Sequence, residues 1–93
     1  MNFEKLSNDL YYKSSHYKFA KKPTKFDQGY VKISEWVGEL CWHYISRRKE
    51  LEGRMEEEFI GLIKEQKSKV SALAPSLYKE GLLKALEEVS ALD

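Results

Sequence analysis

The chain has 93 residues, and its 16 lysines and arginines against 15 aspartates and glutamates leave a formal net charge of +1. This length fits one domain, residues 1–93, and excludes a large self-contained enzyme, because a chain of this size buries only roughly 60 to 65% of its unfolded surface. A partner subunit is therefore expected to add stability. No apolar run is long enough for a membrane span and the start lacks a secretory signal, so a cytoplasmic location without membrane contact is expected.

The sequence contains no motif typical of an enzyme or a cofactor site. Cys41 is the only cysteine, which excludes an internal disulfide and a multi-cysteine zinc site. Cys41 and His43 are two positions apart, about 200° around a helix, so they cannot hold one metal ion together. We therefore interpret Cys41 as a core residue and His43 as a surface residue, and we expect no catalytic residue, no metal and no cofactor.

The first helix is expected over residues 2–21. Its apolar residues follow helical spacing, as Phe3, Leu6, Leu10, Tyr17 and Ala20. Asn2 is a suitable N-cap, because its side chain can accept a hydrogen bond from an unpaired amide of the first turn. Pro23 ends this periodicity, and the segment 22–30 is expected to be a linker.

The clearest periodicity runs from 31 to 74. Apolar residues recur there at steps of three and four, interrupted only by two polar residues: Ile33, Val37, Leu40, Tyr44, Arg48, Leu51, Met55, Phe59, Leu62, Gln66, Val70 and Leu73. From Leu40 onward the steps repeat every eleven residues, which is typical of a straight helix. We expect one continuous helix over 31–74, of which 40 residues would span about 60 Å. A break at Gly53 is the main way in which this prediction could fail, since glycine weakens a helix.

A last helix is expected over 76–91, after Pro75. The first and last helices together match the length of the central one, so each can fold back along half of it. The predicted fold is therefore all-α, with three helices (short, very long, short) in an elongated antiparallel layer. Such a layer leaves one apolar side open, and homodimerisation would complete it into a bundle.

The central stripe is the predicted dimer interface. Its residues are Leu40, Tyr44, Arg48, Leu51, Met55, Phe59, Leu62 and Gln66. A symmetric antiparallel register would bring Arg48 near Gln66 of the partner, where a polar residue can fix register. In the alternative interpretation Arg48 extends its charged end to water, and the acidic triplet 56–58 counts against the register by crowding its centre.

Charge and aromatic residues are unevenly distributed. Residues 1–33 hold seven lysines and three acids, a net +4, while residues 34–93 hold nine bases and twelve acids, a net −3. Ten of the twelve aromatic residues lie within the first 44 positions. The predicted partner surface consists of Tyr11, Tyr12, Lys13, Lys18, Lys21, Lys22 and Lys25.

Three functions are compatible with this pattern. The preferred one is a non-enzymatic helical dimer that presents the basic, aromatic surface to another protein. The alternative is binding of nucleic acid, since single strands are bound by stacking on aromatic rings and by neutralising phosphates. A small helical enzyme comes third. In a purely structural interpretation, the rings pack the first helix and the lysines keep the surface in water.

Overall fold

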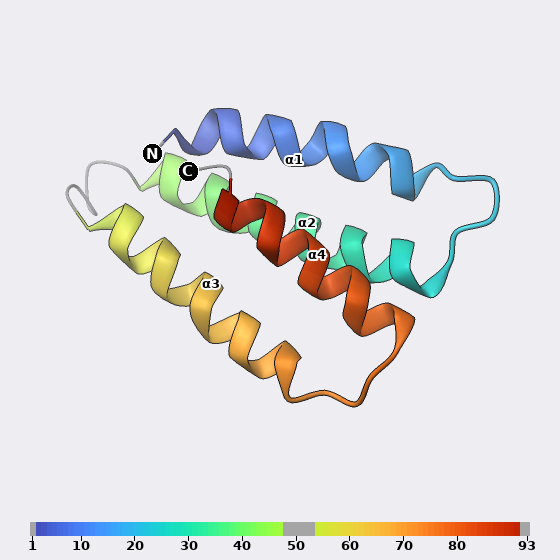
Figure 1. Ribbon diagram of the computed structural model, residues 1–93. Coiled ribbons are helices and arrows are strands. Elements are labelled where there is room, and N and C mark those ends of the chain that lie inside the picture. The colour runs from blue at the N-terminus through green and yellow to red at the C-terminus, as the bar shows by residue number, and fades with distance from the viewer. Residues whose placement is uncertain (1, 48–53, 92–93) are drawn as a thin grey trace.

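A computed structural model describes residues 2–47 and 54–91, and these residues form four helices with no strand among them. The helices are α1 (Phe3–Lys18), α2 (Lys25–Ser46), α3 (Met55–Ser71) and α4 (Leu77–Ala91). Figure 1 shows α1 and α2 as an antiparallel pair, α4 lying against α2, and α3 running back alongside α4. α2 packs extensively against both α1 and α4, whereas α3 contacts α4 more sparsely. The all-α class is confirmed, and α2 is the central helix.

Side-chain caps set the starts of α1 and α2. The predicted cap at Asn2 is confirmed, because its Oδ1 accepts a hydrogen bond from the Lys5 amide at 3.0 Å. At α2, the Asp27 amide donates to the Thr24 hydroxyl at 3.2 Å, and the Thr24 amide donates to the Asp27 carboxylate at 2.9 Å. This reciprocal capping box satisfies two amides that a helix start leaves unpaired. It starts α2 at Lys25, inside the segment 22–30 that the sequence predicts as a linker.

The prediction of three helices with one continuous helix over 31–74 is wrong. α2 ends at Ser46 and α3 begins at Met55, and the ring centroids of Tyr44 and Phe59 lie only 6.1 Å apart. In one straight helix these fifteen positions would be separated by about 22 Å. The chain therefore reverses between the two helices; Gly53 itself lies outside the described residues.

The length expected of the central helix is also wrong. The longest dimension of the molecule is 42 Å, well short of the roughly 60 Å rod that the stripe predicts. The physical reason is that reversal lets Phe59 pack against Phe3 and Tyr44 of the same chain, with ring centroids 5.3 and 6.1 Å away. The apolar side that a straight layer would leave for a partner is thus covered from within.

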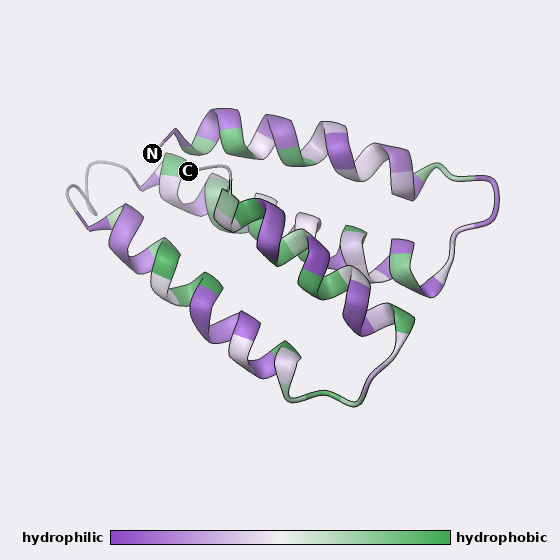
Figure 2. Ribbon diagram, in the orientation of Figure 1, coloured by the Kyte–Doolittle hydropathy of each residue, from purple (hydrophilic) through white to green (hydrophobic). Residues whose placement is uncertain are grey.

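The hydrophobic core draws on all four helices. Figure 2 shows hydrophobic residues recurring along each helix between hydrophilic ones, as amphipathic helices require. Leu10 of α1, Val37 of α2, Phe59 of α3 and Leu86 of α4 are buried members of one continuous cluster. Cys41 is fully buried in the same cluster, which confirms its interpretation as a core residue.

Two glycines let α2 and α4 meet backbone to backbone. A Cβ built on Gly29 would overlap the carbonyl oxygen of Tyr78, and a Cβ built on Gly81 would overlap the carbonyl oxygen of Phe26. Only a residue without a side chain fits either position. This close approach is what allows α4 to lie along α2 and hold Tyr30 and Val37 away from water.

Candidate functional site

The most distinctive surface feature is a groove of about 300 Å³ between α1 and α2. Its lining residues are Ser7, Tyr11 and Ser14 of α1 and Ser34, Glu35, Gly38, Glu39 and Trp42 of α2. The Tyr11 and Trp42 side chains are 75% and 64% exposed, so two large aromatic residues line one groove while remaining open to solvent. We call this feature the α1/α2 groove.

Small residues form the low floor of the α1/α2 groove. Ser14 and Ser34 are buried, and a Cβ built on Gly38 would meet no atom within 4 Å. The Ser14 hydroxyl donates to the Tyr11 carbonyl at 3.2 Å, and the Ser34 hydroxyl donates to the Tyr30 carbonyl at 2.9 Å. Both hydroxyl protons are therefore engaged within their own helices, and the serine oxygens keep lone pairs as acceptors.

The charged residues of the groove lining are both acids. Glu35 and Glu39 are four positions apart on α2, so their carboxylates lie on the same face of that helix. Lys18 of α1 places its Nζ 3.5 Å from a Glu35 oxygen, and both side chains of this pair are 56% exposed. An ion pair so open to water holds its partners weakly, so Glu35 remains accessible to another cation.

The structure divides the predicted partner surface into two parts. Tyr11 lies in the α1/α2 groove, whereas Tyr12 is exposed outside its lining, with its ring edge-on to His16 at 5.2 Å. Lys13 is half-buried. The remaining lysines are exposed at the end of α1, in the turn and at the start of α2: Lys18, Lys21, Lys22 and Lys25. Of the predicted residues, only Tyr11 lines the α1/α2 groove, and whether the set binds a partner stays a prediction.

A second hollow of about 270 Å³ lies nearer the lysine-bearing end and shares Glu35 with the groove. Its charged lining residues are Lys18, Lys32, Asp27 and Glu35, two of each sign. The purely structural interpretation of the aromatic residues holds for Tyr17, which packs against Tyr30 with ring centroids 4.2 Å apart. The α1/α2 groove differs from this second hollow in that both charged residues of its lining are acids.

The predicted dimer-interface residues lie largely inside the fold. Tyr44 and Phe59 are buried. The others within the described residues are partly buried: Leu40, Met55 and Leu62, which pack against the core, and Gln66. Arg48 and Leu51 lie outside the described residues, as does any contact between Arg48 and a partner. The stripe that suggested a dimer is thus used mainly within one chain.

Sequence reasoning missed most of the groove. Trp42 counted only as one of many aromatic residues, and Glu35 and Glu39 resembled the carboxylates of an ordinary solvated helix face. The available signal was spacing. Positions 35, 39 and 42 follow steps of four and three on the side of α2 away from the core, and a tryptophan is unusual on such a polar face.

The buried ionisable groups are structural. Burial raises the pKa of the Cys41 thiol to about 11, so it stays protonated and unreactive near neutral pH. Burial, and then the hydrogen bond that its hydroxyl donates to Glu88, raise the pKa of Tyr30. His43 is exposed, as the sequence predicts. Within residues 2–47 and 54–91, no three histidine, cysteine or acidic residues gather as a metal site would require.

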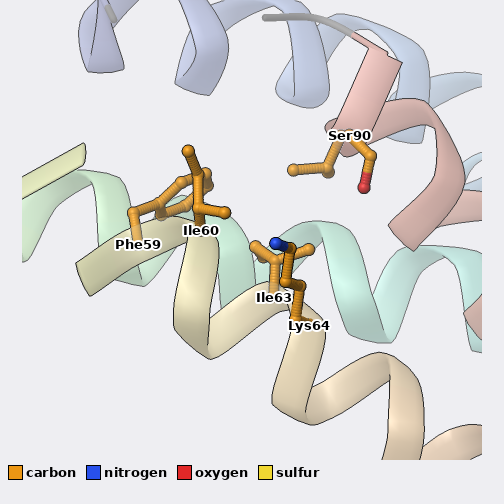
Figure 3. Close-up of a pocket in the computed structure, with 6 residues that line it drawn as sticks. Phe59, Ile60, Ile63, Lys64 and Ser90 are labelled. Carbon is orange, nitrogen blue, oxygen red and sulfur yellow. The ribbon is translucent and has the colours of Figure 1, made fainter. Parts of the chain in front are cut away.

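A further cavity of about 220 Å³ separates α3 from α4 (Figure 3). Its lining residues are Phe59, Ile60, Ile63, Lys64, Val89 and Ser90. Figure 3 shows the side chains of Phe59, Ile60 and Ile63 on α3, with Ser90 across the gap on α4. Because hydrocarbon dominates this lining and α3 contacts α4 only sparsely, we interpret the cavity as incomplete packing between the two helices.

In comparisons with known proteins, no family model, no curated protein and no solved structure matches the chain. Among the described helices, none is long and apolar enough to cross a membrane. The function of the chain must therefore be inferred from its own residues, and the α1/α2 groove is the site with the most distinctive chemistry.

Proposed function

We propose that the protein is a non-enzymatic interaction module whose α1/α2 groove receives a segment of a partner protein. One observation carries the proposal, namely that Tyr11 and Trp42 line the same groove at 75% and 64% exposure. Tyrosine and tryptophan are enriched at protein interfaces, where they supply large contact areas at a small entropic cost. Tyr12 and Phe19 are exposed as well, but only Tyr11 and Trp42 line this groove, where one partner segment can contact both rings.

The size of the groove favours a polypeptide segment as its occupant. A volume of about 300 Å³ is at the lower end for small-molecule sites, which usually enclose most of their ligand. The groove has exposed side chains as walls, so an occupant would stay partly in contact with solvent. One or two side chains of a larger partner meet this condition.

Nucleic-acid binding is the second candidate, supported by the exposed lysines of the α1–α2 turn, such as Lys21 and Lys22. The groove itself disfavours it, because Glu35 and Glu39 would repel phosphates from the ring of Tyr11. The two functions differ in salt dependence. Contact with about six phosphates would weaken binding roughly 10³-fold between about 50 and 200 mM salt.

Selection from a random peptide library tests the proposal. We expect the wild-type protein to enrich a peptide motif that Trp42→Ala and Tyr11→Ala no longer bind. Tyr12→Ala is the matched control, since Tyr12 is equally exposed but does not line the groove. Enrichment that survives both groove variants, or a wild-type protein that enriches nothing, would overturn the proposal.

Homodimerisation and a cytoplasmic location stay predictions from the sequence. Apolar surface for a dimer is present where α3 leads into α4, since Leu73 and Leu77 are 50% and 57% exposed. Sedimentation at micromolar concentration distinguishes a dimer from a monomer of about 10.9 kDa. Leu73→Ser and Leu77→Ser would dissociate a dimer formed through these two side chains.

A further inference from the structure

We infer that the α1/α2 groove selects a cationic side chain, and arginine in particular, from the partner segment. The inference rests on the proposed function and adds the chemistry of the residue that the groove accepts. Its basis is the combination of two acids, Glu35 and Glu39, with two exposed aromatic rings, Tyr11 and Trp42, around one hollow.

The aromatic rings provide the first half of the recognition. The face of an aromatic ring is electron-rich and attracts cations, with tryptophan the strongest and tyrosine next. A guanidinium group is planar and can stack on such a face while its edge donates hydrogen bonds. Trp42 and Tyr11 come from different helices, so a side chain inserted between α1 and α2 contacts both walls.

Hydrogen-bond chemistry provides the second half. The hydroxyl protons of Ser14 and Ser34 are engaged with carbonyls of their own helices, so these serines offer the groove acceptor oxygens. The carboxylates of Glu35 and Glu39 are acceptors as well. Arginine is a donor without acceptor capacity, with five N–H groups in a fixed fork. The groove therefore complements arginine and disfavours an acidic or acceptor-rich residue.

The chain itself demonstrates that the groove edge attracts a cation. Lys18 already reaches Glu35, with 3.5 Å between the ammonium nitrogen and the carboxylate oxygen. Because both side chains are more than half exposed, an incoming arginine can replace this lysine at little cost. Glu39 supplies a second carboxylate one helical turn away.

The test follows the indole N–H signals of the two tryptophans by NMR during titration with three short peptides. The peptides share the sequence Gly-Ala-X-Ala-Gly, where X is arginine, its neutral isostere citrulline, or glutamate. We expect the arginine peptide to shift the Trp42 signal. Trp36 packs against the core and does not line the groove, so its signal is the internal control.

Neutralising the two acids of the groove tests the role of their charge. Glu35→Gln combined with Glu39→Gln should weaken binding of the arginine peptide by about tenfold or more, as loss of complementary charge implies. Glu87→Gln, an exposed acid on α4, should leave it unchanged. All three positions are exposed, so the variants should keep the helical circular-dichroism spectrum of the wild type.

The outcomes separate this inference from the proposed function. If citrulline or glutamate peptides shift Trp42 with the affinity of the arginine peptide, the groove binds peptides without selecting a cation, and only the inference fails. If no peptide from the library or the titration shifts Trp42, the proposed function fails with it. A shift of Trp42 produced by a single-stranded oligonucleotide, but by no peptide, would also overturn both.

Discussion

Gly29 of α2 and Gly81 of α4 face each other's helices at the point where the two backbones touch. A methyl group at either position would overlap a backbone carbonyl oxygen, which cannot move aside as a flexible side chain can. The α2–α4 contact, which covers much of the core, therefore requires that Gly29 and Gly81 each carry a hydrogen atom in place of a Cβ.

We predict that Gly29→Ala and Gly81→Ala each lower the free energy of unfolding by about 1 to 3 kcal/mol or more, because overpacking forces the helices apart. Gly61→Ala is the matched control, since a Cβ there would meet no atom within 4 Å. It should raise stability by about 0.5 to 1 kcal/mol through its higher helix propensity. Urea denaturation measures the free energy of unfolding of all three variants. Equal effects at Gly61 and Gly81 would contradict the close backbone contact between α2 and α4.

The reversal between α2 and α3 predicts magnetisation transfer between aromatic rings. The ring centroids of Phe3 and Tyr44 are 5.1 Å apart, and those of Phe3 and Phe59 are 5.3 Å apart. Nuclear Overhauser effects should therefore connect all three rings. One continuous helix would hold Tyr44 and Phe59 about 22 Å apart and give no such effect between them.

Phe59→Ala is expected to destabilise the protein by about 3 to 5 kcal/mol, the usual cost of removing a buried phenyl ring. Phe59 is 2% exposed and is the ring through which α3 joins α1 and α2. Phe19→Ala provides the control, because Phe19 is 75% exposed and its removal should change stability by no more than about 0.5 kcal/mol. Thermal denaturation should show a large fall in Tm for the first variant alone.

Alkaline pH should destabilise the fold. Burial raises the pKa of the Tyr44 hydroxyl from 10.0 to about 12 and that of the Cys41 thiol from 9.0 to about 11. The unfolded chain loses these protons first, so the stabilisation is complete below about pH 9 and falls as pH rises through the folded pKa values. Urea denaturation between pH 8 and 11 should show a loss of about 2 kcal/mol or more.

Cys41→Ala should make this pH dependence shallower, because it removes one of the groups that titrate differently in the folded and unfolded states. The variant also loses some buried volume, so its stability must be compared with the wild type at each pH. A free energy of unfolding that stays constant from pH 8 to 11 in the wild type would show that neither Tyr44 nor Cys41 titrates as the structure implies.

Much of the fold is present in local sequence signals. Asn2 marks the start of α1 through its capping side chain, Pro75 marks the break before α4 through its missing amide, and the structure places α1 and α4 close to their predicted ranges. The apolar stripe also identifies core residues correctly at Tyr44 and Phe59. What periodicity cannot specify is which surface covers a stripe, because a stripe of constant spacing serves equally for a straight helix and for two helices folded onto each other.

The candidate site was less predictable for the same reason. Tyr11 attracts notice in a lysine-rich segment, but its importance depends on Trp42, 31 positions later. The two residues share a groove only because α1 and α2 pair antiparallel, and that register is set by core contacts such as Phe3 with Tyr44. No lysine lines the groove, although Lys18 reaches Glu35 at its edge, whereas Glu39 on the neighbouring helix is part of the lining.

The crossing of α2 and α4 also bears on the order in which a newly made chain folds. α1 and α2 are neighbours in sequence and can pair once residues 2–47 have left the ribosome. The face of α2 that carries Gly29 stays uncovered until α4 has been made. Synthesis of the roughly 44 residues from Arg47 to Ala91 takes about 2 to 9 s at typical rates of elongation. For those seconds the nascent hairpin exposes apolar surface, and α4 is the helix that ends its exposure to chaperones and proteases.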